Sequence, residues 1–139
     1  MFCSVDHVTL SVRDAGKAAE FYNVFGFKTA LRWVAPDDSL IISHLLREDG
    51  FILELFQYVE NADKPIAEVG VGNDLERLGV KHLAFRVADL KKTYSELLAF
   101  RCGKLTEIQS GRTGIDYFFI ADPDGNWVEI VEDFRSLDR

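Results

Sequence analysis

Two histidines and two glutamates of this sequence recur at one fixed interval. His7 and His82 are 75 residues apart, and so are Glu54 and Glu129. Neutral imidazole and carboxylate are suitable ligands for zinc, iron, nickel, cobalt and manganese. Four such ligands leave positions open on an octahedral ion, which then acts as a Lewis acid toward a bound substrate. The four residues therefore predict a divalent metal site that takes a small molecule.

The interval belongs to a longer internal repeat. The segment Asp6–Asp14 resembles Lys81–Asp89, and Glu48–Leu55 resembles Pro123–Ile130, both at the same offset of 75. Agreement at both ends indicates two copies of one module. The sequence predicts a single domain over residues 1–139, made of module one at 4–58, a connecting segment at 59–79, module two at 80–132 and a tail at 133–139.

Each module reads as strand, helix and three strands. In module one the hydrophobic alternation predicts strands at 5–12, 27–34, 40–46 and 51–58, with Asp14 capping a helix that Gly26 ends. In module two it predicts strands at 80–87, 104–109, 115–121 and 126–132, with Asp89 as the cap. The fold class is therefore α+β, with two tandem βαβββ modules.

Strand alternation assigns the candidate ligands to faces. His7 shares a face with Thr9 and Ser11, and Glu54 lies on a largely apolar face. A carboxylate on such a face is unfavourable unless it meets a cation or several donors, which favours the metal interpretation. The structural alternative stays open, because duplication also copies a histidine that serves only the fold. Glu132, further along the last strand, is expected to face solvent.

Composition limits the partners. The chain has 16 basic and 23 acidic residues and a net charge of −7, which argues against nucleic acid as a partner. No apolar run approaches the roughly 18 residues of a membrane helix. Cys3 and Cys102 lack metal-site or disulfide-framework spacing, and the first residues lack a secretory pattern, so a cytoplasmic protein is expected.

The motifs of both halves resemble the vicinal oxygen chelate superfamily, which includes glyoxalase I. The typical segments are Asp6-His-Val-Thr-Leu-Ser-Val, Glu20-Phe-Tyr, Phe25-Gly-Phe, Val80-Lys-His-Leu-Ala-Phe-Arg-Val and Asp122-Pro-Asp-Gly-Asn-Trp-Val-Glu-Ile. The resemblance implies a glyoxalase-like sheet cleft, a homodimer and one divalent ion per site. It assigns the ligand positions to His7, Glu54, His82 and Glu129, without fixing the ion as Ni, Zn, Co, Mn or Fe.

Within the superfamily, this ligand set is most similar to that of glyoxalase I. The resemblance implies a lyase or isomerase in which Glu129 removes a carbon-bound proton, an enediolate forms, and Glu54 serves as the partner acid/base. Glyoxalase I usually has an arginine where this chain has Ser11 and an asparagine where it has Tyr58. Because of these departures, the resemblance does not identify the thiol of the substrate as glutathione.

Three other functions remain open at the level of sequence. The run Lys64-Pro-Ile-Ala resembles methylmalonyl-CoA epimerase, in which two acid/base groups would also flank a chelated substrate. An extradiol-type dioxygenase would need one of the four positions to release the metal. A metal-free binding protein of the bleomycin-resistance kind would catalyse nothing.

Four further residues are candidates for contact with the small-molecule substrate: Arg86, Arg112, Tyr58 and Trp127. Arg86 falls on the His82 face, Arg112 lies in a loop, and Trp127 could line an aromatic pocket. His44 has no counterpart in module two, where Phe119 stands, and is interpreted as structural or exposed.

Overall fold

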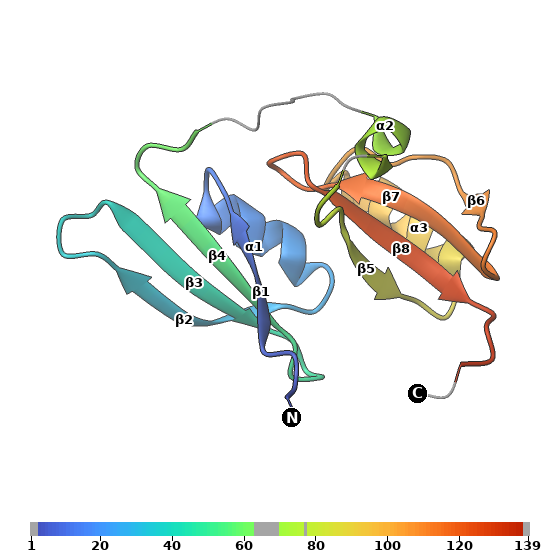
Figure 1. The fold of residues 1–139 in the computed structure, drawn as a ribbon, viewed down its shortest axis with the longest axis horizontal. Coiled ribbons are helices and arrows are strands. Elements are labelled where there is room, and N and C mark those ends of the chain that lie inside the picture. The colour runs from blue at the N-terminus through green and yellow to red at the C-terminus, as the bar shows by residue number, and fades with distance from the viewer. Residues whose placement is uncertain (1–2, 63–69, 77, 138–139) are drawn as a thin grey trace. The chain divides into compact units, whose positions relative to one another are not determined.

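The computed structural model describes residues 3–62, 70–76 and 78–137. The chain forms two compact units, Met1–Pro65 and Ile66–Arg139, each containing one mixed four-stranded sheet (Figure 1). The predicted α+β fold with tandem βαβββ modules is confirmed. The Lys64–Ala67 run lies outside the described residues.

Module one follows the predicted order of elements. They are β1 (His7–Ser11), α1 (Ala15–Asn23), β2 (Lys28–Val34), β3 (Leu40–Leu46) and β4 (Ile52–Tyr58). The strand order is β1-β4-β3-β2, in which β1 is parallel to β4 and the other neighbours are antiparallel. β4 therefore lies between the first strand of the module and β3, so its side chains have neighbours on both sides.

Module two repeats this topology. Its elements are β5 (Leu83–Arg86), α3 (Leu90–Phe100), β6 (Gln109–Ser110), β7 (Ile115–Ala121) and β8 (Trp127–Asp133), preceded by the short helix α2 (Val71–Leu75). The strand order is β5-β8-β7-β6, with β5 parallel to β8. β8 is thus the equivalent of β4.

The two long helices begin in the same way. Asp14 and Asp89 have nearly identical extended backbones, and their carboxylates accept hydrogen bonds from the amides of Lys17 and Lys92 at 3.0 and 2.9 Å. Both predicted N-caps are confirmed. These bonds satisfy amides that the first helical turn leaves without intrahelical partners.

A second contact ties each helix to its sheet. Gln57 Oε1 accepts from the amide of Ala15 at 2.7 Å, and Glu132 Oε2 accepts from the amide of Leu90 at 3.0 Å. Gln57 and Glu132 are 75 residues apart. The expectation that Glu132 faces solvent is therefore wrong, because its carboxylate is occupied by the start of α3.

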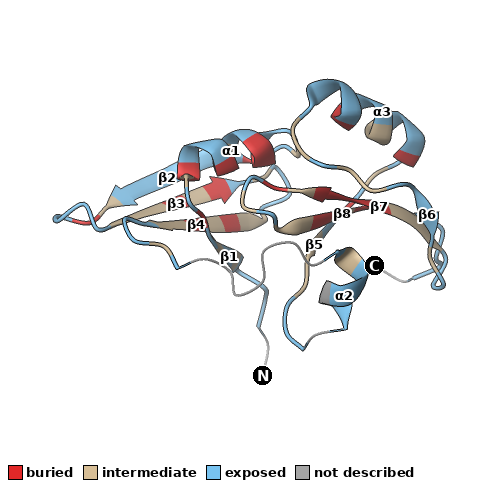
Figure 2. Cartoon of the chain, turned by 90° about the horizontal axis from the view of Figure 1, so that it is seen from above, coloured by how far each residue is buried: buried red, intermediate tan, exposed pale blue. Residues whose placement is uncertain are grey.

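Each helix covers the apolar face of its own sheet. In module one, α1 contacts β2, β3 and β4, and Phe21 and Tyr22 are buried together with Leu53 and Leu55 (Figure 2). In module two, Leu97 of α3 is buried, and Tyr94 meets the fully buried Phe118 edge-on at 5.0 Å. The opposite face of each sheet carries a candidate glutamate, Glu54 in module one and Glu129 in module two.

The predicted strand at 104–109 is wrong in extent. Only Gln109 and Ser110 form a strand, and Leu105 makes an isolated bridge to Ile120. A Cβ on Gly103 would lie 2.3 Å from the carbonyl oxygen of Ala121, so the chain passes too close to the end of β7 for any side chain at this position. The Thr106 amide still donates to the carbonyl of Phe119 at 2.9 Å, but the amide of Phe119 donates to Thr106 Oγ1 at 2.9 Å, where a regular strand would offer the Thr106 carbonyl oxygen.

Helix α2 was not predicted, because the Gly- and Asn-containing segment shows no helical periodicity. Within residues 3–62, 70–76 and 78–137, every helix is too short or too polar to span a bilayer.

Candidate functional site

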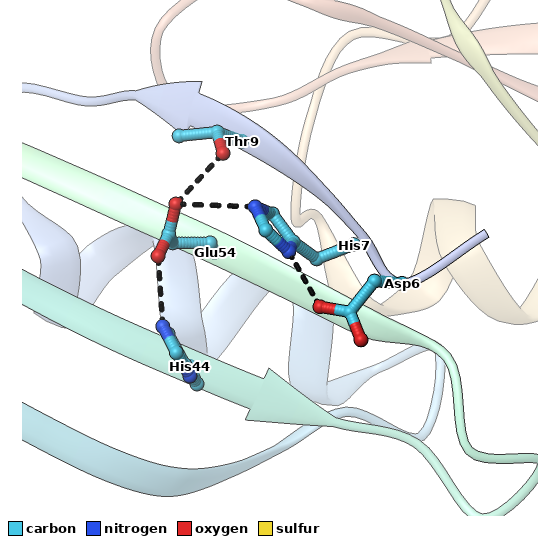
Figure 3. Close-up of polar contacts among 5 residues, drawn as sticks. All are labelled: Asp6, His7, Thr9, His44 and Glu54. Carbon is cyan, nitrogen blue, oxygen red and sulfur yellow. Dashed lines mark hydrogen bonds and ion pairs between the residues drawn. The ribbon is translucent and has the colours of Figure 1, made fainter. Parts of the chain in front are cut away.

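Glu54 is the centre of a polar cluster in module one. The parallel register places Thr9 of β1 opposite Glu54, and the antiparallel register places His44 of β3 opposite it on the other side. His7 precedes Thr9 by two residues and therefore shares its face. The sheet brings these side chains together on its exposed face (Figure 3).

Both oxygens of the Glu54 carboxylate have a close partner. Thr9 Oγ1 donates to Oε1 at 2.8 Å, and His44 Nε2 lies 2.8 Å from Oε2. His7 Nε2 lies 3.7 Å from Oε1, and its Nδ1 lies 2.8 Å from a carboxylate oxygen of Asp6. Only 13% of the Glu54 side chain is exposed, so these contacts replace most of its water.

The interpretation of His44 as structural or exposed is therefore wrong: its imidazole, 35% exposed, binds the candidate ligand Glu54 directly. A search for residues shared by both modules misses it, because its counterpart is Phe119. The register of the hairpin formed by β3 and β4 is the signal that could have revealed this contact. A turn centred between Arg47 and Phe51 pairs residue 44 with residue 54.

The cluster shifts two acid–base equilibria. Burial acts to raise the pKa of Glu54, but the hydrogen bonds from Thr9 and His44 and the nearby imidazoles outweigh it, so the pKa is lowered. The hydrogen bond with Asp6 raises the pKa of His7, and the charge of Glu54 adds to this. Both effects favour an ionised carboxylate beside a histidine whose Nδ1 is held by a second carboxylate.

Module two presents the equivalent pair with different surroundings. His82 directly precedes β5, and its Nε2 lies 3.3 Å from Glu129 Oε2. The register places Ala84 and Phe119 on the two sides of Glu129. Phe119 packs edge-on against the His82 ring at 5.1 Å. The Glu129 side chain is only 14% exposed, as in module one.

The two pairs therefore differ at three equivalent positions. Module one has Asp6, Thr9 and His44 around its histidine and glutamate, and module two has Lys81, Ala84 and Phe119. Neither Ala84 nor Phe119 can hydrogen-bond to a carboxylate through its side chain. Among the described residues, Glu129 meets only the imidazole of His82 within ion-pair distance.

The donor chemistry of each pair fits a divalent metal. When neutral His7 donates its Nδ1 proton to Asp6, the Nε2 lone pair faces a carboxylate oxygen, an arrangement that a cation stabilises. A carboxylate orienting a ligating histidine is a common feature of metal sites. Across residues 3–62, 70–76 and 78–137, no three His, Cys, Asp or Glu side chains are arranged to hold one ion, so each pair by itself offers two donors.

The four residues expected to contact substrate are more dispersed. Arg86 is exposed on β5, and Arg112 is exposed in the turn before β7. Tyr58 ends β4 with 43% of its surface exposed. Trp127 begins β8 half-buried, with its ring 6.2 Å from that of Phe119. Of these, the structure connects Trp127, through Phe119, to the surroundings of His82.

Comparison with known sequences gives a family match over most of the chain. The family model described as Glyoxalase/Bleomycin resistance protein/Dioxygenase superfamily matches residues 4–130. Glyoxalase I of Saccharomyces cerevisiae is 26% identical over 144 residues, covering 91% of this chain but 44% of the yeast protein. The chain thus spans less than half of that relative. The Bacillus subtilis protein YwbC is 28% identical, with 92% and 96% of the two chains covered.

Solved structures show the same architecture. The structure of SMU.1112c superposes with a TM-score of 0.73 at 29% identity and covers 95% of this chain and 100% of its own. Glyoxalase I of Leishmania major gives a TM-score of 0.72 at 19% identity, covering 95% and 88% of the two chains. At this low identity, the likeness to the Leishmania protein concerns the fold alone.

Proposed function

This chain belongs to the Glyoxalase/Bleomycin resistance protein/Dioxygenase superfamily, and from that premise we propose that it is a metal-dependent, glyoxalase I-like lyase or isomerase. It would move a proton on a small oxygenated substrate. One divalent ion (Ni, Zn, Co, Mn or Fe) would be bound by His7 and Glu54 of one module and by His82 and Glu129 of the other.

At the same offset in both modules, a histidine and a poorly exposed glutamate face each other, with N–O distances of 3.7 and 3.3 Å. A repeat preserved only for the fold needs apolar and capping residues at fixed positions, but not two pairs of metal-type donors on the uncovered faces. The relationship to glyoxalase I of yeast points in the same direction.

The carboxylates supply the proton chemistry. Glu129 is proposed to remove the carbon-bound proton, and the electron pair left behind is delocalised onto the neighbouring carbonyl oxygen of the substrate. Glu129, or Glu54 as the partner acid/base, then returns the proton to the adjacent carbon. The hydroxyl proton of the first carbon passes to the second oxygen, which leaves a new carbonyl group on the first carbon and completes the isomerisation. A bound ion would act as a Lewis acid toward the two vicinal oxygens.

The substrate and the assembly are also part of the proposal. Arg86 and Arg112 offer positive charge to an anionic group, and Trp127 and Tyr58 offer aromatic surface. Because Ser11 and Tyr58 replace residues typical of glyoxalase I, the thiol of a hemithioacetal substrate is not assumed to be glutathione. We propose a homodimer acting in the cytoplasm.

Solvent-exchange measurements test the role of Glu129. The chain, purified without chelator and loaded with Ni²⁺ or Zn²⁺, is incubated in D₂O with hemithioacetals made from a 2-oxoaldehyde and either glutathione or a smaller thiol. Deuterium incorporation is followed by NMR. Glu129→Gln is expected to keep the metal and to slow exchange by about 10²–10⁴-fold, the usual contribution of a positioned acid or base.

Glu132→Gln is the matched control, because it makes the same substitution three residues later on β8 and keeps an oxygen for the amide of Leu90. Unchanged exchange in Glu129→Gln would remove Glu129 as the base. A wild-type chain that takes up no divalent ion would support the metal-free binding alternative. Oxygen uptake with catechols and bound iron would indicate a dioxygenase, and exchange on an acyl-thioester would indicate an epimerase.

A further inference from the structure

The contact between His44 and Glu54 has no equivalent in module two. His44 and Phe119 occupy the same place in the repeat, each directly opposite the candidate glutamate of its module. The imidazole reaches Glu54 Oε2 at 2.8 Å, whereas the Phe119 ring turns to His82 and is itself only 4% exposed. Glu54 is therefore held by the residue opposite it on the adjacent strand, and Glu129 is not.

The Glu54 carboxylate is held at both ends. Thr9 binds Oε1 and His44 binds Oε2, from strands on opposite sides of β4. Because the two donors come from different strands, rotation of the carboxylate would break at least one hydrogen bond. Hydrogen bonds with charged groups are the stronger ones in proteins, so the orientation is well fixed.

On the basis of the proposed function, we infer that His44 is a positioning residue that fixes the orientation of the Glu54 carboxylate as a metal ligand and leaves removal of the carbon-bound proton to Glu129. A neutral His44 with its proton on Nε2 donates to Oε2 and has no lone pair on that atom for a metal. Partners of ligating carboxylates tune metal sites in this way without binding the ion themselves.

Metal affinity provides the first test. Apo-protein is titrated with Co²⁺, whose visible absorption reports the ligand set, and the affinity for Zn²⁺ follows from competition. His44→Phe, which gives module one the residue of module two, is expected to weaken binding by about 10–100-fold, as loss of an outer partner does. His44→Gln restores an N–H near the place of Nε2 and should recover most of the affinity.

Leu46→Phe is the control, since it places the same ring on the same face of β3, two residues away and at an exposed position. Thr9→Val should weaken binding as well, through the other oxygen of Glu54. Equal affinity and an unchanged Co²⁺ spectrum in His44→Phe would overturn the inference.

The position of the imidazole proton provides the second test. In long-range ¹H–¹⁵N spectra of the Zn²⁺-loaded protein, His44 should keep its proton on Nε2, and His7 should keep its proton on Nδ1, facing Asp6. Loss of the Nε2 proton of His44 on zinc binding would make it a direct ligand and contradict the positioning role.

The inference and the proposed function fail in different ways. A wild-type chain that binds no ion contradicts the proposed function. The His44–Glu54 contact can then still be measured through its effect on the stability of the metal-free protein. In a double-mutant cycle with His44→Phe and Glu54→Gln, non-additive shifts of the urea midpoint support the positioning contact. Simple additivity overturns it.

Discussion

The two modules have the same frame, meaning the same strand order, helix caps and turn glycines, but they differ in the residues around their histidine–glutamate pairs. Helix caps at Asp14 and Asp89, the strand order of each sheet and the left-handed glycines of the turns, Gly50 and Gly125, are the same in both. The neighbours of Glu54 and Glu129 are different. The repeat has thus kept what the fold and the pairs themselves require, while the surroundings of each pair have diverged.

This difference gives the two carboxylates different freedom. The Glu54 carboxylate is fixed by two hydrogen bonds from neighbouring strands and keeps its orientation. Glu129 has alanine and phenylalanine at those two positions and meets only His82, at 3.3 Å among the described residues, so its carboxylate changes orientation at lower cost. A ligand benefits from the first condition and a proton acceptor from the second.

The glutamates should differ most in their effect on metal binding. Glu54→Gln is expected to weaken Zn²⁺ binding by more than about a hundredfold, beyond the usual loss for an outer partner, and Glu129→Gln by less than about tenfold. Calorimetric titration of the two apo-variants measures this. Equal losses would mean that the modules contribute equivalent ligands and would end the distinction between them.

The turns before β4 and β8 should differ in stability. Asp122 is buried, and its oxygens accept from the amides of Asp124 and Asn126 at 2.9 and 2.7 Å and from the side chain of Asn126 at 2.7 Å. Asp122→Ala should lower the free energy of unfolding by about 2–3 kcal/mol, since bonds to charged groups are lost. Urea denaturation should show a smaller loss for Asp49→Ala, at the exposed turn of module one.

Phe119→His imposes the chemistry of module one on module two. We expect a loss of about 1–3 kcal/mol in stability, because a polar ring enters a site that is 4% exposed. If the new imidazole binds Glu129, deuterium exchange on the hemithioacetal should slow by at least about tenfold. Exchange at the wild-type rate in a folded variant would show that holding Glu129 does not matter.

The helix caps should behave alike. Asp14→Ala and Asp89→Ala each remove one hydrogen bond of about 3 Å to an amide of the first turn. Each should lower the free energy of unfolding by about 1 kcal/mol. Thermal and urea unfolding of the two variants checks this, and a large difference between them would show that the shared frame is not equally stable in its two copies.

The smallest effect is expected at the Arg47–Asp49 pair of module one. The hydrogen bond from the Arg47 guanidinium lowers the pKa of Asp49 to about 2, below the ordinary value of 3.8. The ionised form is favoured by folding, so its stabilisation is complete above the ordinary value and is lost as pH falls toward about 2. Since Asp49 is exposed, the effect is small. Urea midpoints of wild type and Asp49→Asn should converge over this pH range.

Much of this frame was predictable from local patterns. Asp14 and Asp89 are recognisable as caps because a short acidic side chain precedes a helical periodicity, and the shared offset identified both modules. The irregular course of residues 104–109 was not predictable, because it depends on the close approach of Gly103 to Ala121 in the folded chain. Local alternation contains no information about such a contact.

The site was predictable only where the modules agree. His7, Glu54, His82 and Glu129 stand out because they are repeated, and the structure pairs them two by two within their modules. His44 contacts Glu54 as closely as any residue of the cluster, yet it has no repeated counterpart. Its position follows from the register of one hairpin, so a comparison of the two halves directs attention away from it.

One divalent ion is proposed to use donors from both modules. The most direct measurement is the metal content and Zn²⁺ affinity of the wild-type chain purified without chelator, beside His7→Ala and His82→Ala. We predict one ion for each set of four ligands, and a loss of affinity of more than about a hundredfold in both variants. No bound or restorable metal in the wild type, or full affinity in either variant, would contradict the claim.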